Sequence, residues 1–187
     1  MANSTVYLEN KTIRLRAPEP SDIDLLYKWE NDTAIWSVSG TLAPFSRFVL
    51  EQYLASSHQD IYSNKQLRLI IDYTIAVEEG EESEPRSIGC IDLFDFDPKN
   101  RKAGVGILIA DRADRGKGFA TEALTLLVEY GFDVLDLHQI YSNVRVDNEN
   151  SVALFKKIGF EITGLKQDWI LDGGRWYDEY TMQLIKK

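Results

Sequence analysis

The chain has 187 residues, 44% of them apolar, which is enough to bury one hydrophobic core, and we expect a single domain over residues 1–187. Its net charge of −9 argues against general nucleic-acid binding, and its apolar runs are too short to span a membrane. The lone cysteine, Cys90, excludes an internal disulfide, and residues 1–10 lack the pattern of a secretory signal, so we expect a reduced, cytoplasmic protein.

Periodicity in the N-terminal half predicts two helices and three strands. Alternating apolar residues are typical of strands, and apolar residues three or four apart are typical of helices. The predicted strands are residues 12–16, 67–77 and 88–94, and the predicted helices are residues 21–31 and 46–57. Ser21 is expected to cap the first helix. Residues 78–85 carry five acids and predict a solvated hairpin loop between the second and third strands.

The C-terminal half is predicted to continue the sheet around two further helices. Residues 105–109 are apolar on both faces, as is typical of a central strand. The other predicted elements are a helix over residues 120–134, a strand over 139–146, a short helix beginning at Asn148, and a hairpin of strands 161–171 and 176–185. Strands mixed with two pairs of helices indicate one α+β sheet domain.

The segment between the predicted central strand and the long helix is rich in glycine and basic residues. It reads Arg115-Gly116-Lys117-Gly118-Phe119-Ala120-Thr121. Backbone N–H groups of such a turn, together with the positive end of the helix dipole, suit a phosphate or pyrophosphate. A turn that merely reverses the chain is the alternative. A Walker loop is excluded because Gly118, not Ser or Thr, follows Lys117, so no metal is expected.

A second segment, residues 148–160, predicts a short helix with well-defined ends. Asn148 suits the N-cap, while Gly159 suits the left-handed position after the last turn, with apolar Phe160 packing back against the helix. Taken alone, this segment predicts an ordinary core helix.

The two segments together resemble the GNAT superfamily of acyl-CoA N-acyltransferases. The phosphate motif of that family, Arg/Gln-x-x-Gly-x-Gly/Ala, is matched by Arg115, Gly118 and Ala120. Its later motif is matched at five positions, Asn148, Ser151, Leu154, Gly159 and Phe160. The resemblance covers residues 13–185 and is strongest to the branch that acetylates ribosomal-protein N-termini and polyamines such as spermidine. It implies a mixed, mostly antiparallel twisted sheet of about seven strands flanked by about four helices.

The function implied by the resemblance is N-acetyl transfer from acetyl-CoA directly to a primary amine, without a metal. The acceptor would be a peptide or protein N-terminus or a small amine, and a homo-oligomer is compatible with this interpretation. Two alternatives that also bind acetyl-CoA stay open: a polyamine (spermidine) acetyltransferase, and a non-catalytic protein that only binds acetyl-CoA. A third interpretation is an interaction module that uses the acidic surface and binds no CoA.

The resemblance also assigns roles to individual residues. The expected contacts with acetyl-CoA are Ile107, Leu108, Ile109, Arg115, Gly116, Lys117, Gly118, Phe119, Ala120, Thr121, Asn148 and Ser151. The resemblance implies a bulge in the strand before the phosphate loop, which would free backbone groups, and the backbone N–H of Ile109 or Ala110 would bind the acetyl oxygen. Ser151 is the expected acid for the departing thiolate. Asp92 is a candidate base, although an exposed strand acid is the simpler interpretation of that residue.

Some positions depart from the family pattern. Phe155 stands where many relatives have the acidic Tyr, and Gly104 stands where many have a basic Glu. Neither His58 nor His138 lies in a motif, and we expect no catalytic role for them. Five aromatic residues are candidates for a wall of the acceptor cleft: Trp29, Trp36, Trp169, Trp176 and Tyr177. The stretch between Trp36 and Leu50 has no carboxylates, which weakens the polyamine interpretation.

Overall fold

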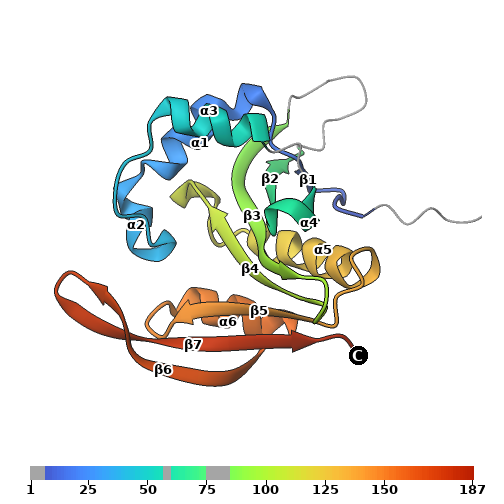
Figure 1. Cartoon of the computed structure of the whole chain (residues 1–187), viewed down its shortest axis with the longest axis vertical. Coiled ribbons are helices and arrows are strands. Elements are labelled where there is room, and N and C mark those ends of the chain that lie inside the picture. The colour runs from blue at the N-terminus through green and yellow to red at the C-terminus, as the bar shows by residue number, and fades with distance from the viewer. Residues whose placement is uncertain (1–6, 57–59, 75–84) are drawn as a thin grey trace, which may run out of the picture.

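The structure is a computed structural model that describes residues 7–56, 60–74 and 85–187. Its seven-stranded sheet has the order β1-β2-β3-β4-β5-β7-β6 (Figure 1). The strands are β1 (Ile13–Arg16), β2 (Leu67–Tyr73), β3 (Arg86–Asp97), β4 (Lys102–Ile109), β5 (Gln139–Arg145), β6 (Glu161–Asp172) and β7 (Arg175–Ile185). Every neighbouring pair is antiparallel except β4 and β5, which are parallel.

Six α-helices and two 3₁₀ turns lie within the described ranges. They are η1 (Pro20–Asp22), α1 (Ile23–Glu30), α2 (Thr33–Ser39), α3 (Arg47–Ser56), α4 (Ile61–Asn64), η2 (Arg112–Asp114), α5 (Phe119–Asp133) and α6 (Glu149–Ile158). The predicted α+β class and seven strands are confirmed, and the four predicted helices are present as α1, α3, α5 and α6, with the short helices α2 and α4 in addition. No helix in the described part of the chain is long and apolar enough to cross a membrane.

Helices cover both faces of the sheet (Figure 1). On one face, Ile71 of β2 belongs to the main core, which includes Leu124 and Leu127 of α5. On the other face, Ile70 joins a smaller core with Leu26 of α1 and Leu54 of α3. Since successive strand residues point to opposite faces, the fully buried pair Ile70 and Ile71 places β2 inside both layers.

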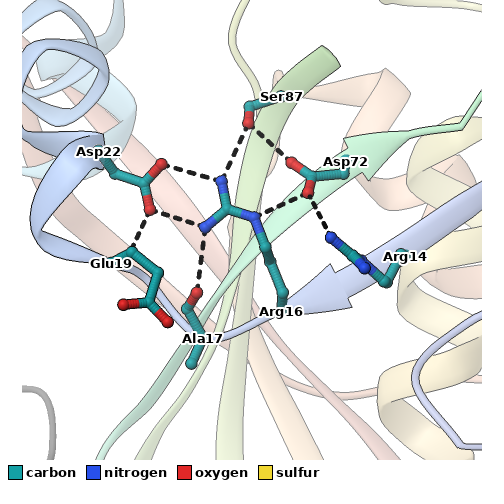
Figure 2. Close-up of polar contacts among 7 residues, drawn as sticks. All are labelled: Arg14, Arg16, Ala17, Glu19, Asp22, Asp72 and Ser87. Atoms are coloured by element: carbon teal, nitrogen blue, oxygen red, sulfur yellow. Dashed lines mark hydrogen bonds and ion pairs between the residues drawn. The ribbon is translucent and has the colours of Figure 1, made fainter. Parts of the chain in front are cut away.

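A polar cluster ties the start of α1 to the sheet (Figure 2). The Arg16 guanidinium donates to both oxygens of Asp22, at 2.7 and 2.9 Å, and its Nε donates to Asp72 at 2.7 Å. Ser87 of β3 donates to the same Asp72 at 2.7 Å. Asp22 and Asp72 are buried, so their pairing with Arg16 offsets the cost of removing two carboxylates from water. The cluster therefore fixes where α1 runs across the sheet.

The strands and long helices lie where the sequence predicts them, with ends shifted by a few residues. The predicted cap at Ser21 is wrong, because Asp22 is the residue at the N-cap of α1 and it bonds to Glu19 and Arg16. Two short helices, α2 and α4, were not predicted. Of the acidic loop at residues 78–85, only Pro85 lies inside the described residues, and His58 lies outside them.

Candidate active site

Strands β4 and β5 separate along their length and open a gap in the middle of the sheet. They pair only from Lys102–Gly104 to Gln139–Tyr141, and beyond this point the two strands have no mutual hydrogen bonds. A cavity of about 490 Å³ occupies this region. It is lined from β4 by Val105, Gly106, Ile107 and Leu108, from β5 by Ser142, Asn143 and Val144, and from α6 and its cap by Asn148, Ser151 and Phe155.

The free edge of β4 turns backbone groups toward the gap. Ala110 donates its N–H to the Ile88 carbonyl of β3 at 3.0 Å, so this donor is already satisfied. Because residues of an antiparallel strand alternate in direction, the N–H groups of Ile107 and Ile109 point the other way, toward the gap. Of the two residues expected to bind the acetyl oxygen, only Ile109 therefore has an available donor.

The pairing of β4 explains why these backbone N–H groups are free, and the explanation differs from the one that the resemblance to the family implies. A bulge in this strand was expected to free its backbone groups. The pairing with β3 is regular from Gly104 to Ile109, and the irregularity lies earlier, between Phe94 and Asp97 of β3. The donors are free because β5 diverges, not because β4 bulges.

The glycine-rich loop ends at the N-terminus of α5 with its backbone donors uncapped. Gly116 and Gly118 have φ of +77° and +94°, and a Cβ built on either would meet nothing within 4 Å. Gly118 is the N-cap of α5 and supplies no side-chain hydrogen bond to the first turn. The first N–H groups of an α-helix have no partner within the helix, and in this position they suit a phosphate.

The charged side chains of the loop hold it in place. Arg115 donates to the carbonyls of Ile109 and Ala110, at 3.0 and 3.2 Å, which fixes the loop against the end of β4. Asp114 is buried and accepts two hydrogen bonds from Arg86, at 2.7 and 2.8 Å, and one from Lys117 at 3.4 Å. The bonds from Arg86 hold the pKa of Asp114 below its usual value in spite of burial. Loop shape is therefore set by ion pairs, and the backbone is left for the ligand.

Helix α6 begins as the sequence predicts. Asn148 is its N-cap, and its Oδ1 accepts the N–H of Ser151 at 3.2 Å. This bond leaves the Asn148 amide nitrogen free to donate into the cavity. Within the described part of the chain the Ser151 hydroxyl has no hydrogen-bond partner, so it too can donate to a ligand. Phe155 is buried and packs edge-on against Phe160, with ring centroids 5.0 Å apart, and offers no proton.

The wall of the same cavity also contains three charged side chains whose pairing was not predicted. Arg68 of β2 donates through Nε to Asp92 Oδ1 at 2.7 Å and through Nη1 to Glu30 Oε1 at 2.6 Å. Asp92 Oδ2 also accepts from Arg68, at 3.3 Å. Asp92 thus lines the cavity and is not the exposed strand acid of the simpler interpretation, since its side chain is only 15% exposed.

Gly104 and Cys90 each have a structural explanation for the lack of a catalytic group at that position. A side chain at Gly104 would meet the ring of Phe94 at 2.2 Å, so an aromatic ring fills the space where relatives place a basic Glu. Cys90 is also in the cavity wall, but burial raises the pKa of its thiol to about 12. A neutral, buried thiol is a poor nucleophile at physiological pH.

Few of the aromatic residues expected to form a cleft wall do so. Trp29 is buried and lines the cavity. Trp36 is half-buried and donates its indole N–H to the Glu30 carbonyl at 2.9 Å, whereas Trp169 and Trp176 of the last hairpin are each 59% exposed and lie outside the cavity wall. Tyr177 lies beneath the guanidinium of Arg145. His138 is exposed, as expected.

A second cavity, of about 680 Å³, lies beside the first and shares Trp29 with it. Its wall is formed by α1, the start of β3, η2 and the residues just before it. Of the residues predicted for acetyl-CoA or catalysis it contains only Ala110, whose N–H already donates to the Ile88 carbonyl. The smaller cavity is therefore the candidate site, because it brings Asn148, Ser151 and the free edge of β4 together. Among the residues that the structure describes, no group of three or more His, Cys, Asp or Glu side chains could hold a metal ion.

Comparison with known proteins agrees with this geometry. A family model described as an acetyltransferase (GNAT) domain matches residues 12–161. The chain is 30% identical over 183 residues to an uncharacterized N-acetyltransferase p20 of Bacillus licheniformis, covering 98% of this chain and 97% of that protein. It is 28% identical over 177 residues to a spermidine N(1)-acetyltransferase of Vibrio cholerae, covering 95% of each.

Among solved structures, a spermidine N-acetyltransferase from Vibrio cholerae in complex with CoA and spermine has the same fold. The TM-score is 0.80 at 27% identity, and the match covers 94% of this chain and 96% of that one.

Proposed function

The chain belongs to the GNAT family of acetyltransferases and is an N-acetyltransferase, and we propose that it transfers the acetyl group of acetyl-CoA to a primary amine within the gap between β4 and β5. The observation that carries the proposal is the gap itself. It places the free edge of β4 opposite Asn148 and Ser151, next to the uncapped N-terminus of α5.

Three sets of residues would hold acetyl-CoA. The backbone N–H groups of Gly116, Lys117, Gly118, Phe119, Ala120 and Thr121 would bind the phosphates. The N–H of Arg115 was also expected to contribute, but it already donates to the Arg112 carbonyl at 3.2 Å. The edge of β4, Ile107 to Ile109, would pair with the pantetheine arm as an added strand does. Asn148 would donate to the same arm through its free amide nitrogen. Acetyl-CoA supplies an activated thioester carbonyl, which an amine can attack without a metal.

Two residues would act on the reacting atoms. The Ile109 N–H is directed into the gap and would stabilise negative charge on the acetyl oxygen. Ser151 would donate a proton to the departing sulfur. A thiol has a pKa of about 8.5, so its anion departs readily and a single weak acid is sufficient. The presence of Phe155 in place of Tyr is therefore compatible with turnover.

Asp92 is proposed to take the proton of the amine only through water. Both of its oxygens accept hydrogen bonds from Arg68, and Gln66 lies at 3.4 Å from Oδ1. A carboxylate has about four acceptor positions, so one on Oδ2 is still available to a water molecule. Closing the cavity over the amine would favour its neutral form by desolvation.

The identity of the amine is the finer part of the proposal. A peptide N-terminus or small monoamine is the first candidate. A polyamine is the second, favoured because a relative of nearly equal length is a spermidine N(1)-acetyltransferase. The chain would work in the cytoplasm, which agrees with a single, buried cysteine. Self-association and the extension of the domain to residues 1 and 187 stay predictions.

A panel of amines tests the proposal. Peptides with free N-termini, monoamines and spermidine are each mixed with acetyl-CoA and the protein, and products are identified by mass spectrometry. We expect at least one acetylated amine and an equal amount of free CoA. Binding of acetyl-CoA by calorimetry with no product from any amine would favour a non-catalytic binding protein. No thermal shift with CoA would favour the interaction module.

A further inference from the structure

We call the part of the candidate site that contains Glu30, Arg68 and Asp92 the amine end. Its positive and negative charges largely cancel. Three charged side chains line the cavity: Glu30, Arg68 and Asp92. Two negative charges and one positive charge leave a net charge of −1. A site for a polyamine would need several unpaired carboxylates, one for each ammonium group that it binds. Here the two carboxylates are already paired with an internal cation.

The position of Arg68 shows that this pairing is a built feature of the cavity wall. Its side chain is only 20% exposed, and its guanidinium lies 5.6 Å from the centre of the Tyr53 ring. Glu30 reaches it from the end of α1 and Asp92 from the neighbouring strand β3. Burial is the largest single effect and lowers the pKa of Arg68, but the charge of Asp92, the hydrogen bonds to it and smaller contributions from neighbouring groups together keep this pKa above its ordinary value. The guanidinium is therefore a permanent positive charge.

We propose that Arg68 determines the charge class of the acceptor: its pairing with Glu30 and Asp92 leaves one negative charge, so the site accepts monoamines and discriminates against diamines and polyamines. This inference rests on the proposed function, because it assumes that the acceptor occupies the end of the cavity opposite Asn148 and Ser151. A single ammonium group is attracted by the net charge of −1 at this end of the cavity. A second ammonium group meets Arg68 and no unpaired carboxylate.

The test compares two amines of equal length that differ by one charge, 1-aminopentane and 1,5-diaminopentane. Their affinities for the complex of the protein with CoA are measured by calorimetry, and their KM and kcat are measured with acetyl-CoA. Wild type should bind the monoamine more tightly than the diamine. Arg68→Met changes the net charge of the site to −2 and should shift the ratio of affinities toward the diamine by about tenfold, mostly in KM.

Two further variants separate charge from structure. Arg68→Met combined with Glu30→Gln restores a net charge of −1 and should return the ratio to that of wild type. Arg68→Lys keeps the charge but not the forked hydrogen bonds, and it should also behave as wild type does. The shift in Arg68→Met should shrink in high salt, as expected for an electrostatic effect. If Arg68→Met does not fold, as judged by circular dichroism, Arg68→Gln has the same net charge and replaces it.

Two outcomes would overturn the inference. One is an unchanged ratio in a folded Arg68→Met or Arg68→Gln variant. The other is a wild-type protein that binds the diamine as tightly as the monoamine or more tightly. Failure of the proposed function is a separate result, since it would appear as the absence of any acetylated amine, while calorimetry would still report the charge preference.

Discussion

At the scale of single residues, Gly118 has the most direct consequence for ligand binding. Its φ of +94° is accessible to glycine and strained for other residues, and no protein atom lies within 4 Å of where its Cβ would be. In the proposed binding mode the phosphates lie against the backbone of this loop and the start of α5. A side chain at this position would therefore meet the ligand and not the protein.

Gly118→Val is predicted to weaken acetyl-CoA binding by at least about tenfold, with a loss of stability of about 1–2 kcal/mol from the strained backbone. Gly174→Val is the matched control, because Gly174 also has positive φ, +79°, and open space around it, but lies in the turn between β6 and β7. The control should lose comparable stability and keep its affinity. Equal affinities for wild type and a folded Gly118→Val, measured by calorimetry, would remove the proposed phosphate site.

Ser151→Ala is predicted to lower the single-turnover rate by up to about 10²-fold with little change in acetyl-CoA affinity. The Ser151 hydroxyl has no partner within the described residues, and alanine is a better helix former, so the variant should be as stable as wild type. Ser151→Thr keeps a hydroxyl and should recover part of the rate. If chemistry limits the rate and Ser151→Ala is as fast as wild type, Ser151 is not the acid.

At the scale of elements, the placement of α1 matters because it carries Trp29 and Glu30 into the cavity wall. The anchor of this helix is the cluster around Arg16, which joins β1, β2 and β3 to Asp22 at its start (Figure 2). A change in this anchor should therefore alter both the stability of the fold and the geometry of the amine end.

Asp22→Asn is predicted to destabilise the protein by about 1–3 kcal/mol at pH 7, because it removes the charge that Arg16 pairs with. Burial of Asp22 raises its pKa, but the hydrogen bonds from Arg16 and from the Glu19 backbone outweigh burial, so its pKa lies below the ordinary 3.8. The stabilisation is therefore complete above about pH 4 and is lost as pH falls through the folded-state value.

Urea unfolding at a series of pH values checks this prediction. The difference between wild type and Asp22→Asn should shrink as the pH falls below 4. Asp24→Asn is a suitable control, since Asp24 pairs with Arg47 at the surface and its side chain is 81% exposed. That control should change stability by less than about 1 kcal/mol. A difference for Asp22→Asn that is constant from pH 7 to pH 2 would contradict the linkage.

The order of elements could be predicted from the sequence because each long element has a clear period and clear ends. The cap at Asn148 and the left-handed Gly159 are local signals, and both appear in the structure. The short helices α2 and α4 were missed although Asp32 and Asp60 cap them. Helices of seven and four residues show too little periodicity to be separated from loops.

The amine end of the site could not be predicted from the sequence. Arg68, Glu30 and Asp92 come from β2, α1 and β3, and their pairing depends on how α1 crosses the sheet. Phe94 fills the space next to Gly104 because of the register between β3 and β4. Both are long-range contacts that leave no local pattern, whereas the loop and the α6 cap are local and were predicted.

At the scale of the whole molecule, β4 and β5 separate, and residues from both halves of the sheet contribute to the proposed site between them. One half supplies the edge of β4 and the amine end, and the other supplies α6 and its capping residue. Cys90, the sole cysteine, is buried among α1 and α3 residues with its pKa raised to about 12. Among the side chains that the structure describes around this site, none is activated as a nucleophile, so the acetyl group should pass directly from acetyl-CoA to the amine.

Labelled acetyl-CoA tests this central claim most directly. The protein is incubated with radiolabelled acetyl-CoA, first alone and then with an amine that the panel identifies as an acceptor, and each sample is denatured before counting. We predict that the protein alone stays unlabelled and that label appears on the amine when it is added. Stoichiometric label on Cys90 that is released by the amine, or label that never reaches any amine, would contradict direct transfer in the gap between β4 and β5.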